Sequence, residues 1–480
     1  MRYKTGMDKH QQTLLPPSLE DYVPENHICR IISAFTEQLD MIGLGYKYAA
    51  CKEAGRPPYD PRMLLNLYIY GYLHRVRSSR RLEAETHRNV EVMWLMEGLE
   101  PDDKTISNFR RDNAKALRET FRVFVRMLRE LELYGGGVEA TDSTKFRANN
   151  SRKNNHNKTT VERELSRLDK KISEYMNALD RADKEESDEH APTPDEIQAA
   201  LEKLRKRKVK FDELLSRIEA GGEVSTVDPE SRLMSSRGDA RALDVCYNAQ
   251  TVVDDKYHLI VDFDVTSNPS DRGELQNMSE RTKDALGAEA ITNLADKGYY
   301  DGEDIASCEA NGVTCLVAKP KAGGAKKDEG FTHDDFRYDR EQDCYTCPCQ
   351  NTLKFMRIQK HSNGKEYRVY ANYAACPRCP RRSACTKAKH RQILRLPYQD
   401  TLDIVDARTR SNRELYRKRQ QIVEHPFGTI KAVWGFKQFL CRGTEKVTAE
   451  TALAYLAYNL RRTINIFRAD DRDLAATFGG

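Results

Sequence analysis

The chain has 480 residues, enough for about three domains of ordinary size, each with its own hydrophobic core. Charged residues make up 32% of it, but 79 basic and 74 acidic side chains leave a net charge of only +5, so overall charge selects no partner. No apolar run approaches the ~18 residues of a membrane span, and the first residues lack the apolar core of an export signal. These features argue against a membrane protein and predict a cytoplasmic one.

Residues 60–132 carry apolar residues at helical spacing. Within them, the basic segment Arg75–Arg81 and the short segment TISNFRRDN, Thr105–Asn113, are similar to parts of a helix-turn-helix. We therefore expect residues 1–134 to form a helical DNA-binding domain, and the alternative is a plain helical bundle with a solvated basic face. The side chains expected to contact DNA are Arg80, Arg81, Arg110 and Arg111, with the amides of Asn108 and Asn113 reading bases.

Residues 159–221 interrupt an α/β pattern with two helical segments. In both, apolar residues recur at alternating spacings of four and three, as in a coiled coil, and Lys208 fills one apolar position. Each segment starts with a capping box, and Pro194 takes the first helical position of the second segment. The pattern predicts an inserted helical hairpin with a coiled-coil seam and a polar tip at residues 187–192. The two capping pairs are Thr159 with Glu162 and Thr193 with Glu196.

The segments on either side of this insertion alternate between strand and helix. A short strand in GVEATDSTKF ends at Asp142, and a second strand, residues 290–295, is closed by Asp296. Carboxylates at strand ends lie at the rim of a sheet, where hard oxygen ligands can hold Mg²⁺ against the phosphate of a nucleic acid. The other predicted elements are strands at residues 243–253, 257–265 and 313–317, helices at 273–286 and 301–311, and a final amphipathic helix carrying Leu453 to Ile464.

A third candidate acid, Glu424, lies in VEHPFGTIK, with Lys431 seven positions further on. With Asp142 and Asp296 it completes a set suited to a metal-dependent DNA-processing site. One aspartate at a strand end is more often a cap or an ion-pair partner, so the prediction depends on the combination. His425 is interpreted as a packing residue, because two-metal chemistry requires no general base. The rival carboxylates, interpreted as supporting or structural acids, are Asp262, Asp264 and Asp271.

Six of the 12 cysteines lie between Cys344 and Cys385, after a break rich in glycine and lysine. In a reducing compartment such a cluster indicates metal rather than disulfides. Four thiolates suit a tetrahedral structural Zn²⁺ site with no open position for water, whereas unligated thiols are the alternative. We predict a zinc-binding insertion at residues 321–404, with Cys344 and Cys349 as spare candidates. The predicted ligands are Cys347, Cys376, Cys379 and Cys385.

The stretch YRKRQQIVEHPFGTIKAVWGFKQFLCRG resembles the signature of DDE transposases encoded by bacterial insertion sequences, in which Tyr, Arg, Glu and Lys share one helix. Six residues separate Glu424 from Lys431, as in the signature, but four residues rather than three separate Arg419 from Glu424. ATDSTKF and NLADKGYYDGEDI supply the two aspartates, so the resemblance covers most of the chain. The residues in the signature positions are Tyr416, Arg419, Glu424 and Lys431.

The resemblance implies a multidomain α/β protein with an RNase H-like mixed sheet flanked by helices, built from residues 135–158, 222–320 and 405–470. It implies two Mg²⁺ or Mn²⁺ ions held by Asp142, Asp296 and Glu424. These ions would serve cleavage at the terminal inverted repeats of a transposon and strand transfer into double-stranded target DNA. A homodimer assembled on nucleoid DNA is a further expectation, with Tyr416, Arg419 and Lys431 contacting DNA. Two alternatives stay open: a catalytically silent DNA-binding descendant, and a metal-dependent nuclease that cuts without joining.

Overall fold

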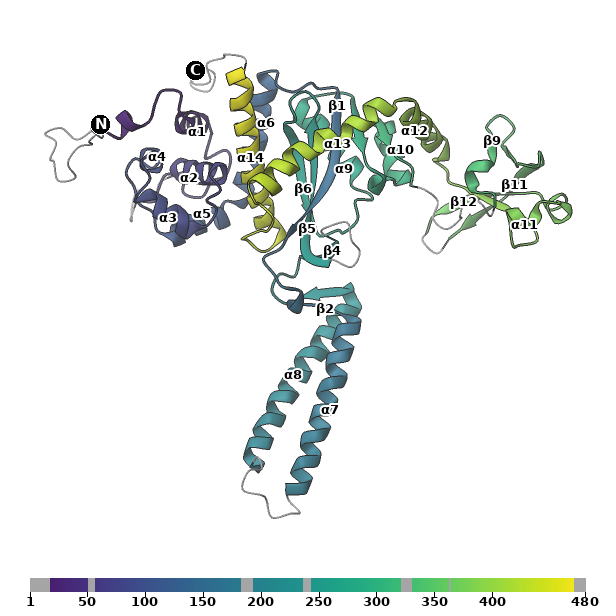
Figure 1. Ribbon diagram of the computed structural model, residues 1–480, viewed down its shortest axis with the longest axis horizontal. Coiled ribbons are helices and arrows are strands. Elements are labelled where there is room, and N and C mark those ends of the chain that lie inside the picture. The colour runs from purple at the N-terminus through teal and green to yellow at the C-terminus, as the bar shows by residue number, and fades with distance from the viewer. Residues whose placement is uncertain are drawn as a thin grey trace, which may run out of the picture.

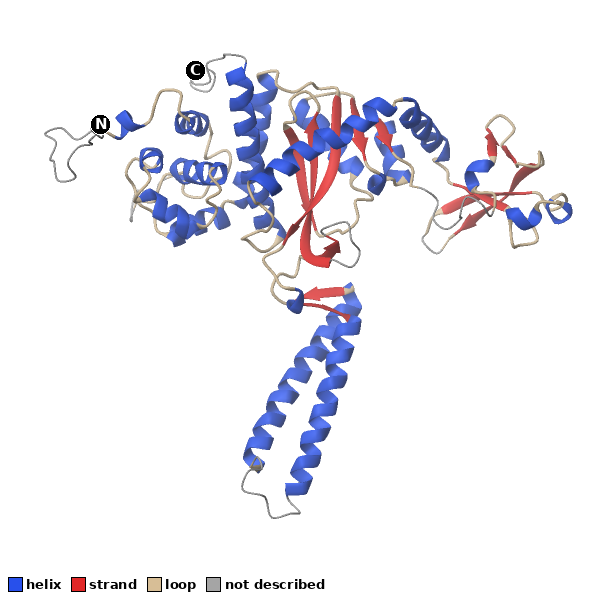
Figure 2. Ribbon diagram, viewed as in Figure 1, coloured by secondary structure: helices blue, strands red, loops and turns tan. Residues whose placement is uncertain are grey.

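The computed structural model describes residues 18–50, 57–182, 193–235, 243–320, 330–361 and 364–469. Figure 1 shows a central sheet with helices beside it, a group of short helices next to the N-terminal end, a long helical pair that extends away from the sheet, and a second small sheet. Figure 2 separates the helical and sheet-bearing parts by colour. The expected hairpin tip, residues 187–192, lies outside the described residues. No helix in the described ranges is long and apolar enough to cross a membrane.

The N-terminal part is helical, as predicted. Its longest helix, α6, is strongly amphipathic and buries one face. On this face Phe121 packs edge-on against Phe263 of the central sheet, with 5.2 Å between the ring centroids. The N-terminal helices and one face of the sheet therefore share one hydrophobic core, which continues across the expected domain boundary at residue 134. The bounds are η1 Leu19–Tyr22, α1 Ile28–Glu37, α2 Pro61–Leu73, α3 Ser79–Thr86, α4 Val90–Leu95, α5 Asp103–Asp112 and α6 Ala114–Glu130.

The central sheet is mixed, as expected, and its strands lie in the order β6-β5-β1-β7-β8, with the short β4 also paired to β5. β1 pairs antiparallel with β5 and parallel with β7, and β7 pairs parallel with β8. A strand forms at each predicted position, because each of these short segments has either alternating apolar residues or a continuous apolar run. The bounds are β1 Val138–Arg147, β4 Arg232–Ser235, β5 Leu243–Asp254, β6 Ile260–Thr266, β7 Ile291–Ala295 and β8 Val313–Val317.

Helices cover both faces of this sheet. Leu294 and Leu316 face the core shared with α6 and α14, whereas their strand neighbours Ala295 and Cys315 face α9, α10 and α12. This alternation follows from the two-residue period of a strand. The helix α12 starts before the expected boundary at residue 405. The bounds are α9 Leu275–Leu286, η3 Lys297–Tyr299, α10 Gly302–Ala310, α12 Gln399–Ser411, α13 Arg413–Phe427, the π-helix η6 Gly428–Val433, and α14 Thr444–Ala469.

The prediction that a strand ends at Asp142 is wrong. β1 continues to Arg147, because the polar residues after Asp142 pair with β5 along its whole length. The parallel pairing with β7, in contrast, stops at Thr141 and Ala295. Asp142 therefore lies in the middle of β1, at the point where one of its two neighbouring strands ends.

Two long helices, α7 (Lys158–Ala182) and α8 (Pro194–Gly221), lie side by side and extend from the sheet (Figure 1). The Thr193–Glu196 capping box is confirmed, but the expected Thr159–Glu162 box is wrong. α7 begins at Lys158, where Thr160 N donates to Asn157 Oδ1 at 2.9 Å instead. Lys208 pairs across the helices with Asp169 at 2.5 Å, which explains its place in an apolar position. Coiled-coil packing stays a prediction. Shorter elements at the base are η2 Arg152–Asn154, β2 Asn155–Asn157 and β3 Glu223–Ser225.

The cysteine-rich insertion forms an antiparallel sheet in the order β13-β12-β11-β10-β9. Its small core joins Tyr345, Tyr370 and Ile393, with Cys347 and Cys385 packed against it. The sequence did not predict this sheet. The bounds are η4 His333–Asp335, β9 Arg337–Asp339, β10 Cys344–Thr346, β11 Thr352–Lys360, β12 Glu366–Ala371, η5 Cys376–Arg378, α11 Arg382–Cys385 and β13 Gln392–Arg395.

Candidate functional site

Two of the three predicted acids lie close together at the point where the parallel pairing of β1 with β7 ends. β1 and β7 are parallel, and their register runs from Val138 beside Thr292 to Thr141 beside Ala295. Asp142 and Asp296 are the residues that come next after this paired register, Asp142 within β1 and Asp296 just after the end of β7. The negative charge of Asp296 helps to raise the pKa of Asp142, as expected for neighbouring carboxylates.

The Asp142 carboxylate is 26% exposed and accepts two hydrogen bonds. Ser143 N donates to Oδ1 at 2.7 Å, and Nη1 of Arg419 donates to Oδ2 at 2.9 Å. Burial raises the pKa of Asp142, Arg419 opposes that rise, and Asp296 adds to it. Two neighbouring acids that need compensating positive charge fit a divalent cation, which prefers carboxylate oxygen.

Asp296 begins the short helix η3, where Gly298 N donates to its Oδ1 at 2.6 Å. A Cβ at Gly298 would lie 2.8 Å from Oδ1 of Asp296 and 3.4 Å from Oδ2 of Asp271. A side chain at this position would therefore collide with the Asp296 carboxylate, whereas its distance to Asp271 is an ordinary contact. The next residue, Tyr299, is fully buried.

Glu424 lies exposed on α13 and accepts a hydrogen bond from Gln420 Nε2 at 2.6 Å. The same helix reaches the acid pair through Arg419, and Tyr416 donates from its hydroxyl to the carbonyl of Ala295 at 3.2 Å. Glu424 lies five positions after Arg419, which corresponds to about 7.5 Å of rise along the helix. Within the described ranges, Asp142, Asp296 and Glu424 do not bring their ligand atoms within 4.8 Å of one another.

Lys431 follows α13 on the π-helix η6, so Glu424 and Lys431 do not share one regular helix. Its Nζ donates to Oγ1 of Thr144 at 2.5 Å and to the carbonyl of Lys145 at 2.7 Å. Burial chiefly lowers the pKa of Lys431 to about 8. The side chain thus lies against β1, and its expected contact with DNA stays a prediction.

The rival acids differ in their surroundings. Asp262 pairs with Arg281 at 2.7 Å, and Asp264 pairs with Arg118 at 3.2 Å, so both take part in ion pairs away from the acid pair. Asp271 instead lies beside Gly298, in the turn that begins with Asp296. His425 contacts the hydroxyl of Tyr458 at 2.7 Å and stacks on His258, which agrees with a packing role.

Of the six side chains in the N-terminal helices that are predicted to contact DNA, four are exposed and two are buried. Arg110 is 7% exposed with its guanidinium 5.5 Å from the ring of Tyr68, and Asn113 is 4% exposed and donates to the carbonyl of Phe109 at 2.8 Å. Ile106, Phe109, Arg110 and Asn113 share one helical stripe, which faces the core. This placement counts against DNA contacts by Arg110 and Asn113. The exposed side chains are Arg80, Arg81, Asn108 and Arg111.

The insertion brings five thiols around one cavity of about 20 Å³. Cys349, a spare candidate in the sequence, has its Sγ 3.7 Å from that of Cys379, whereas Cys344 is buried in β10 and does not line the cavity. Sulfur donors around a small cavity fit a structural zinc ion. Within the described ranges, no three of these sulfurs lie within 4.8 Å of one another. The lining cysteines are Cys347, Cys349, Cys376, Cys379 and Cys385.

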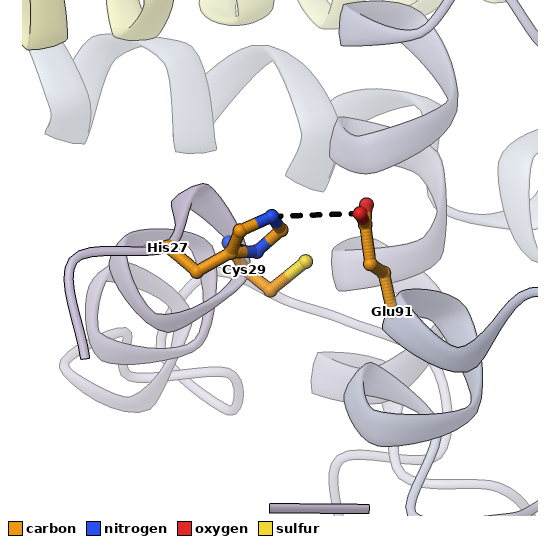
Figure 3. A group of neighbouring side chains, drawn as sticks. All are labelled: His27, Cys29 and Glu91. Carbon is orange, nitrogen blue, oxygen red and sulfur yellow. Dashed lines mark hydrogen bonds and ion pairs between the residues drawn. The ribbon is translucent and has the colours of Figure 1, made fainter. Parts of the chain in front are cut away.

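One group with metal-ligand chemistry was not indicated by the sequence. His27, Cys29 and Glu91 bring their ligand atoms within 4.8 Å of one another (Figure 3). His27 Nε2 lies 3.5 Å from Glu91, which also accepts from the hydroxyl of Tyr70 at 2.6 Å. Burial raises the pKa of the Cys29 thiol to about 12, and Glu91 adds to that rise. Because these partners satisfy one another, we interpret the group as a packing link between α1 and α4.

Comparison with known proteins gives two matches. Residues 17–112 match the family described as transposase domain (DUF772), and residues 346–464 match the family described as transposase DDE domain. No curated protein and no solved structure matches the chain. The second match contains Glu424, Lys431 and the cavity-lining cysteines, but Asp142 and Asp296 lie outside both.

Proposed function

Because this chain belongs to the DDE transposases of insertion sequences, we propose that it binds the ends of an insertion sequence and catalyses DNA strand cleavage and strand transfer. The observation that carries the proposal is the parallel pairing of β1 with β7, which brings Asp142 beside Asp296. The mixed sheet with helices on both faces supports an RNase H-like assignment. The protein would act in the cytoplasm on nucleoid DNA, as a homodimer on the two ends.

In this proposal Asp142, Asp296 and Glu424 hold two Mg²⁺ or Mn²⁺ ions, which when bound stabilise the attacking and leaving oxygens of a phosphoryl transfer. Arg419 supplies positive charge to Asp142, and Tyr416 ties α13 to the end of β7. Glu424 is exposed on the same helix, so its carboxylate is open to solvent and to DNA.

The test uses the full chain and DNA that carries the inverted repeats flanking its gene. Asp142→Asn, Asp296→Asn and Glu424→Gln should each abolish Mg²⁺-dependent end cleavage, whereas Asp264→Asn, a matched change on the same sheet, should retain it. A variant of the first three that cleaves at the normal rate removes its residue from the site. Cleavage without joined products would support the nuclease alternative, and DNA binding without cleavage would support the silent descendant.

End recognition is proposed for the N-terminal helices. A combined change of the exposed arginines to Ala should weaken DNA binding. The slope of log K against log salt concentration should become less negative by up to about three, because each lost phosphate contact removes about 0.9 from it. Arg126→Ala, an exposed arginine on α6, is the control. An unchanged slope would move recognition elsewhere in the chain. The arginines to change are Arg80, Arg81 and Arg111.

A structural zinc ion is proposed for the insertion, held by four of the five cavity-lining thiols. Cys347, Cys376, Cys379 and Cys385 are the predicted set, and the 3.7 Å approach of Cys349 to Cys379 favours Cys349 as a replacement for one of them. The ion would join the loops after β10 and β12, whose own core is small. Zinc analysis of the purified protein should give about one ion per chain.

A further inference from the structure

Asp271 is a third carboxylate near Asp142 and Asp296. It is located between β6 and α9, and its side chain is 17% exposed. Oδ1 accepts from Asn248 Nδ2 and from Gln250 Nε2, both at 2.8 Å, and both amide-bearing residues are fully buried. Lys145 Nζ lies 3.4 Å from both carboxylate oxygens. Such a complete set of partners distinguishes Asp271 from a solvated loop acid.

These partners connect Asp271 to the strand that carries Asp142. Ser143 pairs with Gln250 and Lys145 pairs with Asn248 across β1 and β5, so all four lie on one face of the sheet. Lys145 Nζ also donates to Oγ of Ser143 at 2.9 Å. The contacts of Asp271 therefore fix the backbone of β1 on both sides of Thr144, immediately after Asp142.

A second set of contacts reaches the turn that carries Asp296. The hydroxyl of Tyr299 donates to Oε1 of Gln250, the same amide that donates to Asp271. Oδ2 of Asp271 also lies across Gly298 from the Asp296 carboxylate, at 3.4 Å from the position of a Cβ there. Asp271 is thus connected through Lys145 to Ser143, the residue after Asp142, and through Gln250 and Tyr299 to the turn that carries Asp296.

The charge of Asp271 is maintained by these neighbours. Burial would raise its pKa, but Lys145 and the donors Asn248, Ser143 and Gln250 outweigh burial and hold the pKa below its usual value. The carboxylate therefore stays ionised at neutral pH, and Lys145 stays directed toward it.

We propose that Asp271 is a positioning residue for the metal-binding aspartates. It fixes β1 next to Asp142 through Ser143 and Lys145, and it fixes the η3 turn next to Asp296 through Gln250 and Tyr299. The inference rests on the proposed function, since it assigns a role in holding that function's divalent ions.

The test measures Mn²⁺ binding by the full chain without DNA, using electron paramagnetic resonance of free Mn²⁺. Asp271→Asn keeps an oxygen for the two amide donors but loses the pairing with Lys145. The half-saturating Mn²⁺ concentration should rise about tenfold or more, as for other residues that orient metal ligands. End cleavage should recover toward the wild-type rate at saturating Mn²⁺. Asp264→Asn, an equal charge change on β6, should leave Mn²⁺ binding unchanged.

Two outcomes would overturn the positioning role. One is a folded Asp271→Asn protein whose half-saturating Mn²⁺ stays within about twofold of wild type. The other is a loss of thermal stability with no change in that concentration. Should Asp271→Asn fail to fold, Tyr299→Phe, which removes only the hydroxyl that reaches Gln250, must show the weakened Mn²⁺ binding or the proposal fails. A different result would refute the proposed function itself: the wild-type protein binds no Mn²⁺, or Asp142→Asn binds Mn²⁺ as well as wild type does.

Discussion

Replacing Lys431 by methionine should change how the stability of the protein depends on pH. The Lys431 ammonium is held against β1 by Thr144 and by the carbonyl of Lys145. Burial chiefly lowers its pKa from 10.5 to about 8, and the positive charge of the Lys145 side chain acts in the same direction. The charged form is thus less favourable in the folded chain than in the unfolded chain.

The size and sign of the effect follow from proton linkage. Below pH 8 both states carry the proton, and the folded state bears a cost of about 3 kcal/mol, at about 1.4 kcal/mol per pKa unit. Between pH 8 and pH 10.5 the folded chain releases its proton first, so the unfolded chain binds more protons and stability rises with pH. From pH 7 to pH 9.5 this contribution should amount to about 2 kcal/mol.

The assay is urea unfolding of the full chain at about pH 7 and about pH 9.5. Wild type should gain about 2 kcal/mol relative to Lys431→Met as the pH rises. Lys437→Met, a change of an exposed lysine nearby, should show no such trend relative to wild type. A difference between wild type and Lys431→Met that stays constant across this range would refute the reasoning that burial of this ammonium costs stability.

Three further changes test other parts of the chain. Burial raises the pKa of Glu139 from 4.5 to about 8, so the stability that its protonated form contributes is present below pH 4.5 and is lost as the pH rises through 8. Between about pH 5 and pH 8, the free energy of unfolding of Glu139→Gln, measured in urea, should therefore rise by about 3 kcal/mol relative to wild type. Cys379→Ser should lose the zinc ion that is proposed for the insertion, and Cys344→Ser should keep it; the reverse result in metal analysis would exclude the cavity as the site. Glu450→Gln, which removes a fully buried charge 3.3 Å from Arg77, should lower the free energy of unfolding by on the order of 3 kcal/mol, and an unchanged unfolding midpoint would contradict this.

Five of the six strands of the central sheet could be predicted, because each shows its apolar pattern within one short segment, whereas the short β4 was not predicted. The pairing of strands leaves no such local pattern. TDSTK resembles a turn, and only its pairing with β5 makes it part of a strand. The same limit applies to Arg110, whose charge suggests the surface although its helical position faces the core.

The candidate site, like the sheet, was predicted only in part. Asp142 and Asp296 could be paired from their places after apolar segments, and the β1–β7 register brings them together. Asp271 could be named only among three supporting or structural acids, and Cys349 only as a spare thiol candidate. The contacts that distinguish them involve Gly298 and Cys379 respectively, each more than 20 residues away in the sequence. A Cys-Pro-Cys segment at residues 347–349 was the one sequence signal for the second of these.

The buried carboxylate of Glu450 bears on how DNA recognition and catalysis are connected. It accepts from the backbone of Leu440 at 2.9 Å and of Cys441 at 3.0 Å, and it pairs with Arg77, which also donates to the carbonyl of Gln438 at 3.0 Å. Arg77 precedes the helix α3 that carries Arg80 and Arg81, whereas the segment after η6 leads directly from Lys431 to α14. The helix α6 packs on α14, and one hydrophobic core joins the N-terminal helices to the sheet. The two parts therefore form one body rather than two domains connected by a linker. DNA held by α3 and α5 would then take a fixed position relative to the acid pair, which explains why recognition should be tested in the full chain and not in a fragment ending at residue 134.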